Sequence, residues 1–160
     1  MTKPEFIYTT YIKTTPEKLW AVITNPEFTR QYWGKDNVSD WKKGSKWQSF
    51  TIDDSRTVVI AGEVLESVPA KRLVLTWASP DDAADVSQVT FEIEPVGNMV
   101  RLIVIHGNFT KDSNMASRVA AGWPLVLSSM KSFLETGKAL DIWAGKESGC
   151  ATLVAKGVAA

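Results

Sequence analysis

The chain has 160 residues, 44% hydrophobic and 22% charged, which is typical of a soluble globular protein and long enough to bury about two-thirds of its unfolded surface in one core. Its 18 Lys and Arg residues balance its 18 Asp and Glu residues, and this zero net charge argues against a protein that binds nucleic acid through an excess of basic residues. A single Cys and a single His exclude an internal disulfide, an all-cysteine metal site and a multi-histidine metal site.

The N-terminal residues contain no apolar run like the core of a signal sequence. No apolar segment approaches the ~18 residues that are needed to span a membrane. We therefore expect a cytoplasmic protein that does not insert into a membrane.

The chain begins with the signals for one strand and two short helices. Residues 5–13 are rich in aromatic and β-branched residues and predict a strand. Thr15 is then a good N-cap, and Pro16 suits the first position of a helix. The apolar face of this helix consists of Leu19, Trp20, Val22 and Ile23. Pro26 begins a second short helix, which extends to about Tyr32.

The middle of the chain predicts an antiparallel sheet. Strand patterns cover residues 45–52, 57–68, 72–77, 87–95 and 100–109. The connections between these strands are short, which favours antiparallel neighbours because a parallel pair needs a long crossover.

The last predicted element is a long amphipathic helix. Ser113 or Asn114 is suited to cap its start, and Gly137 is suited to end it. Its apolar stripe at helical spacing consists of Trp123, Leu127, Met130 and Leu134. Pro124 either kinks this helix or begins its main part, because proline lacks the backbone N–H that a helix interior requires.

Together these elements predict an α+β protein in which a curved antiparallel sheet wraps around the long C-terminal helix, with two short helices after the first strand. We expect one domain over residues 1–145. Residues 146–160 form a tail that we expect to be disordered or to form a short extra helix. A gap between a curved sheet and its helix is a natural apolar pocket.

Four segments in this order resemble a known family: "TTPEKLWAVITNPEFTRQYW" (14–33), "GEVLESVPAKRLVLTW" (62–77), "SQVTFEIEPVGNMVRLIVIHGNF" (87–109) and "GWPLVLSSMKSFLETGK" (122–138). They are similar to the activator of heat-shock-90 ATPase homologue-like family of the START-like helix-grip superfamily, which also contains polyketide cyclases and lipid-transfer domains. The resemblance covers about residues 5–143 and implies a sheet that grips a C-terminal helix around a cavity. It also implies a link to the stress response and a chaperone as a possible partner.

The inward rows of the sheet and the stripe of the long helix give a predicted ligand-binding set. Alternation puts Val100, Leu102, Val104 and His106 on the inner face. The whole set is Trp33, Trp77, Phe91, Leu102, Val104, His106, Trp123, Leu127 and Met130. Trp77 and Trp123 have two interpretations, since an indole in a cavity can stack on a flat ligand and an indole in a core simply packs.

His106 also has two interpretations. At the end of an apolar row its imidazole could hydrogen-bond a ligand or move a proton, or it could be satisfied by a backbone carbonyl or a water near the end of the strand. The acidic loop 79–85, with Asp81, Asp82 and Asp85, is interpreted as solvated surface. We therefore assign no catalytic residue, no metal ligand and no cofactor.

The stretch from Tyr32 to Trp47 combines three tryptophans with four lysines. Such interleaving can bind single-stranded nucleic acid, where bases stack on the aromatic rings. We interpret it instead as the rim of the pocket, with Trp41 as its most exposed aromatic residue, and expect no binding of nucleic acid.

Three functions follow from these patterns. The leading hypothesis is a protein that binds a small hydrophobic or aromatic molecule, with little or no catalysis. The second is a cyclase or dehydratase-like enzyme in which His106 moves a proton. The third is an interaction module with a chaperone or a second copy of the chain as its partner.

Overall fold

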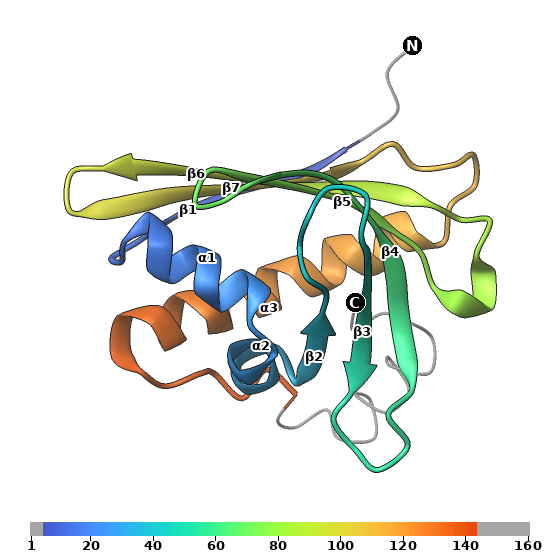
Figure 1. Ribbon diagram of the computed structural model, residues 1–160, viewed down its shortest axis with the longest axis horizontal. Coiled ribbons are helices and arrows are strands. Elements are labelled where there is room, and N and C mark those ends of the chain that lie inside the picture. The colour runs from blue at the N-terminus through green and yellow to red at the C-terminus, as the bar shows by residue number, and fades with distance from the viewer. Residues whose placement is uncertain (1–4, 144–160) are drawn as a thin grey trace.

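The computed structural model describes residues 5–143 of the chain, so the predicted tail, residues 146–160, lies outside the described residues. The elements are β1 (Phe6–Ile12), α1 (Pro16–Thr24), α2 (Pro26–Trp33), β2 (Lys35–Val38), β3 (Lys46–Thr51), β4 (Val58–Val68), β5 (Arg72–Trp77), the 3-10 turn η1 (Pro80–Asp82), β6 (Ser87–Val96), β7 (Met99–Gly107) and α3 (Met115–Thr136). The α+β prediction is confirmed: one antiparallel sheet curves around a long C-terminal helix, and two short helices follow the first strand (Figure 1).

The sheet has seven strands in the order β1-β7-β6-β5-β4-β3-β2. Its register shifts twice, between Ser49 and Phe50 in the β3–β4 pair and between Val64 and Glu66 in the β4–β5 pair. Irregularities of this kind bend a strand and increase its twist. Figure 1 shows the result, since β3 and β4 turn down beside the helices while β6 and β7 run above them.

The two short helices begin where the sequence predicts. The side chain of Thr15 accepts a hydrogen bond from the Lys18 N–H (3.2 Å), and the side chain of Asn25 accepts one from the Glu27 N–H (2.9 Å). Gly34 ends α2 in the left-handed conformation with φ 77°, which costs glycine least because it has no Cβ. The chain therefore turns directly from α2 into β2.

The strand β2 was not predicted from the sequence. Its residues Lys35, Asp36 and Asn37 are polar but buried. The guanidinium of Arg30 donates to Asp36 (2.9 and 2.6 Å), Arg56 pairs with the same carboxylate, and together they hold the pKa of Asp36 below its usual value. The strand is thus stabilised by partners from other elements. Because its own residues are polar, the pattern of hydrophobic residues could not predict it.

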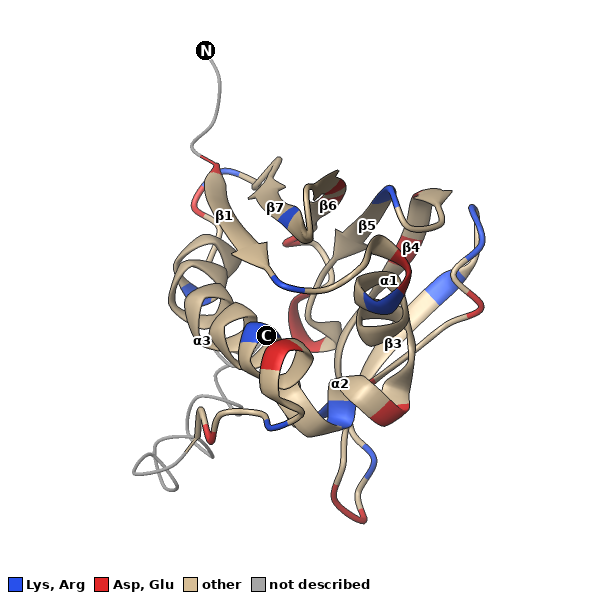
Figure 2. Ribbon diagram, turned by 90° about the vertical axis from the view of Figure 1, so that its left-hand side faces the viewer, with Lys and Arg blue, Asp and Glu red and all other residues tan. Residues whose placement is uncertain are grey.

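The helix α3 lies across the concave face of the sheet (Figure 2). Its buried apolar side chains are Met115, Val119, Trp123, Val126, Leu127 and Met130. Pro124 lies inside one continuous helix. The interpretation in which the main part of the helix begins at Pro124 is therefore wrong. At the C-terminal end, Lys131 Nζ donates to the Tyr11 carbonyl (2.7 Å), and the carboxylate of Glu135 accepts from the Lys13 N–H (2.9 Å).

The acidic loop was predicted to be solvated surface, and for Asp85 this prediction is wrong. The residue is only 7% exposed. Its carboxylate accepts from the N–H groups of Asn114 (3.0 Å) and Met115 (3.1 Å) and from the hydroxyls of Thr110 (3.1 Å) and Ser113 (2.6 Å). Burial alone would raise the pKa of Asp85, but these hydrogen bonds outweigh it and hold the pKa below its usual value. Asn114 makes no side-chain cap of its own, so Asp85 caps α3 from the loop before β6.

We predict that Asp85→Ala lowers the free energy of unfolding by about 2 kcal/mol, because it removes a helix cap and takes an acceptor from several partly buried donors. Because the folded pKa of Asp85 is depressed, its contribution is present above the unfolded pKa of ~3.9 and is lost as the pH falls through the folded value.

Urea titrations at pH 7 measure this loss. Asp81→Ala is the matched control, since Asp81 is exposed in the same loop and its loss should cost less than about 0.5 kcal/mol. Equal losses for the two variants would contradict the assignment of Asp85 as the cap of α3.

Candidate functional site

Five tryptophans gather where α2, α3 and the sheet meet, and we call them the tryptophan cluster: Trp33, Trp41, Trp47, Trp77 and Trp123. Trp77 is central, with ring centroids 5.3 Å from Trp47, 5.4 Å from Trp123 and 6.2 Å from Trp33. Trp33, Trp47, Trp77 and Trp123 are at most 4% exposed. The cluster therefore joins two helices, two strands and one loop into a single aromatic core.

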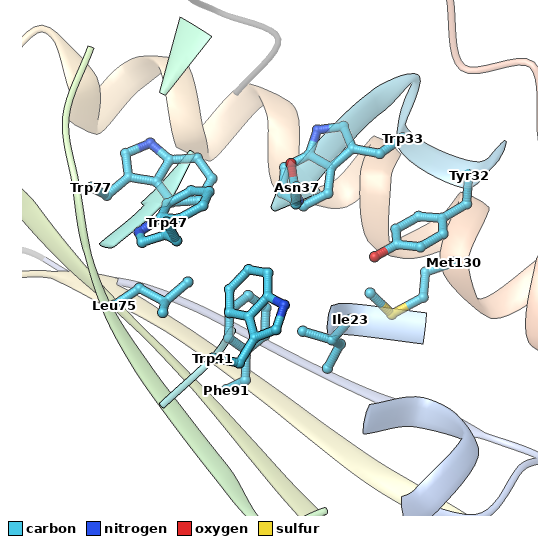
Figure 3. Close-up of a pocket in the computed structure, with 10 residues that line it drawn as sticks. All are labelled: Ile23, Tyr32, Trp33, Asn37, Trp41, Trp47, Leu75, Trp77, Phe91 and Met130. Carbon is cyan, nitrogen blue, oxygen red and sulfur yellow. The ribbon is translucent and has the colours of Figure 1, made fainter. Parts of the chain in front are cut away.

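A small cavity lies inside this core (Figure 3). Its volume is about 10 Å³, which is room for no more than one water molecule. The lining residues are Ile23, Tyr32, Trp33, Asn37, Trp41, Trp47, Leu75, Trp77, Phe91 and Met130. Figure 3 shows Trp47 and Trp77 on one side of this inner cavity and Tyr32 and Met130 on the opposite side.

Four polar atoms on the residues that line the inner cavity are buried without a hydrogen-bond partner among residues 5–143. They are Nε1 of Trp33, Trp41 and Trp77, and Oδ1 of Asn37. Other polar groups on the same wall are satisfied: Trp47 Nε1 donates to the Thr76 carbonyl (2.9 Å), and Tyr32 Oη donates to the Val22 carbonyl (3.1 Å). An unsatisfied buried donor or acceptor costs about 1–3 kcal/mol, so four on the residues around one small cavity call for a physical explanation.

His106 is fully buried beside this cavity but does not line it. Its Nδ1 accepts from Trp123 Nε1 (3.0 Å), which leaves the proton on Nε2, and Nε2 donates to the hydroxyl of Ser87 (2.8 Å). Ser87 in turn donates to the Trp77 carbonyl (3.3 Å). Burial lowers the pKa of His106 from 6.5 to about 3, so the imidazole is neutral. Both of its nitrogens are occupied, which agrees with the interpretation of a satisfied histidine, although its partners are side chains.

Four of the nine residues predicted as ligand-binding line the inner cavity: Trp33, Trp77, Phe91 and Met130. The other five, Leu102, Val104, His106, Trp123 and Leu127, are buried in the surrounding core and do not line this cavity. Their contact with a ligand stays a prediction.

Six lining residues were not in the predicted set: Ile23, Tyr32, Asn37, Trp41, Trp47 and Leu75. The alternation that directs Trp77 inward also directs Leu75 inward, so that signal was present. Asn37 lies on the unpredicted strand β2. Trp41 is the most exposed aromatic residue of its stretch, as predicted, since Tyr32, Trp33 and Trp47 are buried. It is itself only half-buried, and its ring lies 6.3 Å from that of Trp47.

Among residues 5–143, no group of three or more His, Cys, Asp and Glu side chains is placed to hold a metal ion. Within the same part of the chain, no helix is long and apolar enough to cross a membrane. Figure 2 shows Lys and Arg interspersed with Asp and Glu along the elements.

Comparison with known proteins gives a family and several related structures. The family model described as "Activator of Hsp90 ATPase homolog 1-like protein" matches residues 13–135. A comparison with curated proteins gives no match.

Three solved structures illustrate the similarity. The chain is 22% identical to the Aha1 dimer from Colwellia psychrerythraea, with a TM-score of 0.70 over 86% of this chain and 100% of that chain. It is 27% identical to an HSP90 activator from Plasmodium falciparum, with a TM-score of 0.69 over 82% of this chain and 96% of that chain. It is 19% identical to CalU16 from Micromonospora echinospora, with a TM-score of 0.68 over 96% of this chain and 93% of that chain. Identities as low as those to the first and third structures establish the fold alone.

The buried histidine predicts a pH dependence of stability. The folded pKa of about 3 lies below the unfolded value of 6.5, so the unfolded chain binds more protons between these values. The free energy of unfolding should therefore fall as the pH drops below 6.5, by up to about 1.4 kcal/mol for each pH unit.

His106→Gln is the matched control, because glutamine has one acceptor and one donor group for Trp123 and Ser87 and does not titrate. Denaturant titrations between pH 6.5 and pH 4.5 compare the two proteins, and the effect of the carboxylates that they share cancels in the difference between the two pH profiles. Parallel pH profiles would show that His106 is not buried as a neutral group.

Proposed function

This chain belongs to the family of Activator of Hsp90 ATPase homolog 1-like proteins, and on that premise we propose that it binds a small, flat, apolar molecule in the inner cavity without catalysing a reaction on it. The cavity is formed by the fold itself, because it lies between the curved sheet, α2 and α3. Its walls are almost entirely apolar and aromatic, with a few polar atoms, which is the usual composition of a small-molecule site.

The observation that carries this proposal is the set of unpaired polar atoms. Three indole N–H donors and one amide oxygen belong to residues that line a single cavity. A ligand with oxygen acceptors could satisfy the indoles, and a hydroxyl on it could satisfy Asn37 Oδ1. Since donors outnumber acceptors, the best fit is a flat molecule that carries carbonyl oxygens.

The cavity must enlarge before such a molecule enters, because about 10 Å³ holds no more than one water. Trp41 is the side chain best placed to move. It is half-buried on the loop between β2 and β3, whereas the other four indoles of the tryptophan cluster are almost fully buried on helices and strands. An indole that leaves the cavity frees a flat space of its own size, which defines the shape of the expected ligand.

Two features of the inner cavity and its surroundings argue against catalysis. Tyr32 is the one titratable residue that lines the inner cavity, and burial raises its pKa, so it is a poor base at neutral pH. His106, the proton carrier of the enzyme hypothesis, has both ring nitrogens engaged with Trp123 and Ser87. General acid–base catalysis needs a group within hydrogen-bond reach of the substrate.

We predict that 2-acetylnaphthalene, a flat neutral ketone, binds the protein and raises its melting temperature. Trp77→Phe should weaken binding about ten-fold, because it removes an unpaired N–H and keeps an aromatic ring. Trp47→Phe is the matched control, since the N–H of Trp47 is already bonded to Thr76 and its loss should affect stability more than binding.

Calorimetric titration measures the affinity, and native mass spectrometry with a panel of hydrophobic metabolites extends the search. No binding of the ketone or of any panel member would contradict the proposal. Equal loss of affinity in the two variants would contradict the role of the unpaired N–H.

A second candidate function is binding to a chaperone, and one relative favours it. The relative from Plasmodium falciparum is an HSP90 activator. The outer face of β1 exposes Ile7 (61%) and Tyr11 (44%), which are apolar side chains available to a protein partner.

If this chain acts on a chaperone, the purified protein should stimulate the ATPase of the heat-shock-90 protein from its own cell. Ile7→Lys should reduce the stimulation by about ten-fold, since a charge in an apolar contact is costly. Gln31→Lys on α2 is a control for a change of charge alone, because Gln31 is exposed and lies outside β1. Unchanged ATP turnover with an excess of this protein would dismiss the candidate.

A further inference from the structure

A second hollow lies on the surface beside the inner cavity, and we call it the outer groove. Its volume is about 490 Å³ and it is open to solvent. The residues that line it come from α1, from the loop between β2 and β3, and from the β4–β5 region: Trp20, Thr24, Asp40, Trp41, Lys42, Lys43, Ser67 and Pro69.

Trp41 lines both the outer groove and the inner cavity, so this residue lies between them. Its backbone has φ 60°, a conformation that is rare for a bulky residue and is often found at functional sites. Its ring nitrogen has no hydrogen-bond partner among the described residues. The ring is therefore held by packing alone.

The backbone of the loop is held independently of this ring. The Trp41 N–H donates to Ser39 Oγ (2.9 Å), Ser39 Oγ donates to the Lys46 carbonyl (2.8 Å), and the Lys42 N–H donates to Asp40 Oδ1 (2.9 Å). None of these bonds involves the indole. The ring can thus rotate outward while the loop keeps its shape.

The outer groove carries an excess of positive charge. Lys42 and Lys43 are exposed on it, and Asp40 is the one carboxylate among its lining residues. An oxygen of that carboxylate already accepts the Lys42 N–H. The remaining walls include Trp20 and Pro69, so the groove offers cations beside apolar surface.

We propose that the outer groove binds the anionic end of the ligand through Lys42 and Lys43, while its flat apolar end passes Trp41 into the inner cavity. This inference rests on the proposed function of the inner cavity and narrows its ligand to a class: a flat aromatic molecule that carries one carboxylate or a similar anion. A small molecule fits better than an acidic peptide, because the space that the Trp41 indole would vacate is the size of one ring system.

The test uses 2-naphthoate and 2-acetylnaphthalene, which share a ring system and a carbonyl and differ in charge. The protein should bind 2-naphthoate about ten-fold more tightly at low salt, since two exposed charge pairs supply up to ~1 kcal/mol each. The double variant Lys42→Gln, Lys43→Gln should abolish this preference and leave the affinity for the ketone unchanged. Lys111→Gln with Lys138→Gln is the control, because both lysines are exposed outside the groove and the loss of net charge is the same.

A separate measurement tests Trp41. In stopped-flow mixing, Trp41→Ala should speed the association of both probes at least about ten-fold, because it removes the barrier between groove and cavity. Tyr8→Ala is the matched control, since Tyr8 is a half-buried aromatic residue of β1 that lines neither hollow, and its loss should leave the association rates of both probes unchanged.

The outcomes separate the two proposals. Binding of the ketone with no preference for 2-naphthoate, or a preference that survives the loss of both groove lysines, would overturn the anion site and leave the inner cavity as proposed. Equal binding of a tetraglutamate peptide without an aromatic ring would overturn the ligand class. Failure of both probes to bind would contradict the inner cavity, and this inference with it.

Discussion

The hydrogen bond from the Trp123 indole to Nδ1 of His106 joins α3 to the sheet, and the rest of the core is arranged around it. It places a polar bond in the middle of the aromatic packing, and this bond fixes the proton of His106 on the nitrogen that faces Ser87. Because each donor in this chain of side chains meets an acceptor, burial of the only histidine is tolerated. The bond thus ties Trp123 on α3 to His106 on β7 beside the inner cavity.

The five indoles of the tryptophan cluster then divide by what their N–H groups do. Trp47 and Trp123 donate to a carbonyl and to an imidazole, and they act as a fixed frame. Trp33, Trp41 and Trp77 have no acceptor within residues 5–143, and all three line the inner cavity. The same residue type therefore supplies indoles whose N–H groups are bonded within the core and indoles whose N–H groups have no partner there.

The sequence predicts most of the fold because its signals are local. Thr15 and Asn25 cap helices with their own side chains, and Phe91 and Ile93 alternate with polar neighbours along β6. The strand β2 and the cap at Asp85 depend on partners far along the chain, so no local pattern reports them. The candidate site follows the same rule. The alternation along β5 predicts that Trp77 points inward. Whether its N–H finds an acceptor depends on the packed structure, and the presence or absence of that acceptor distinguishes a candidate site residue from an ordinary core residue.

The attachment of α3 to β1 has a consequence for how this protein associates with others. The carbonyl of Tyr11 and the N–H of Lys13 lie on the free edge of β1, and the side chains of Lys131 and Glu135 already occupy them. The opposite edge of the sheet is β2, which is four residues long and packs against α2. Exposed strand edges are where sheets recruit further strands and grow into aggregates. Since α3 occupies the C-terminal end of one edge and the other edge is only four residues long, little of either edge is suited to the addition of a further strand.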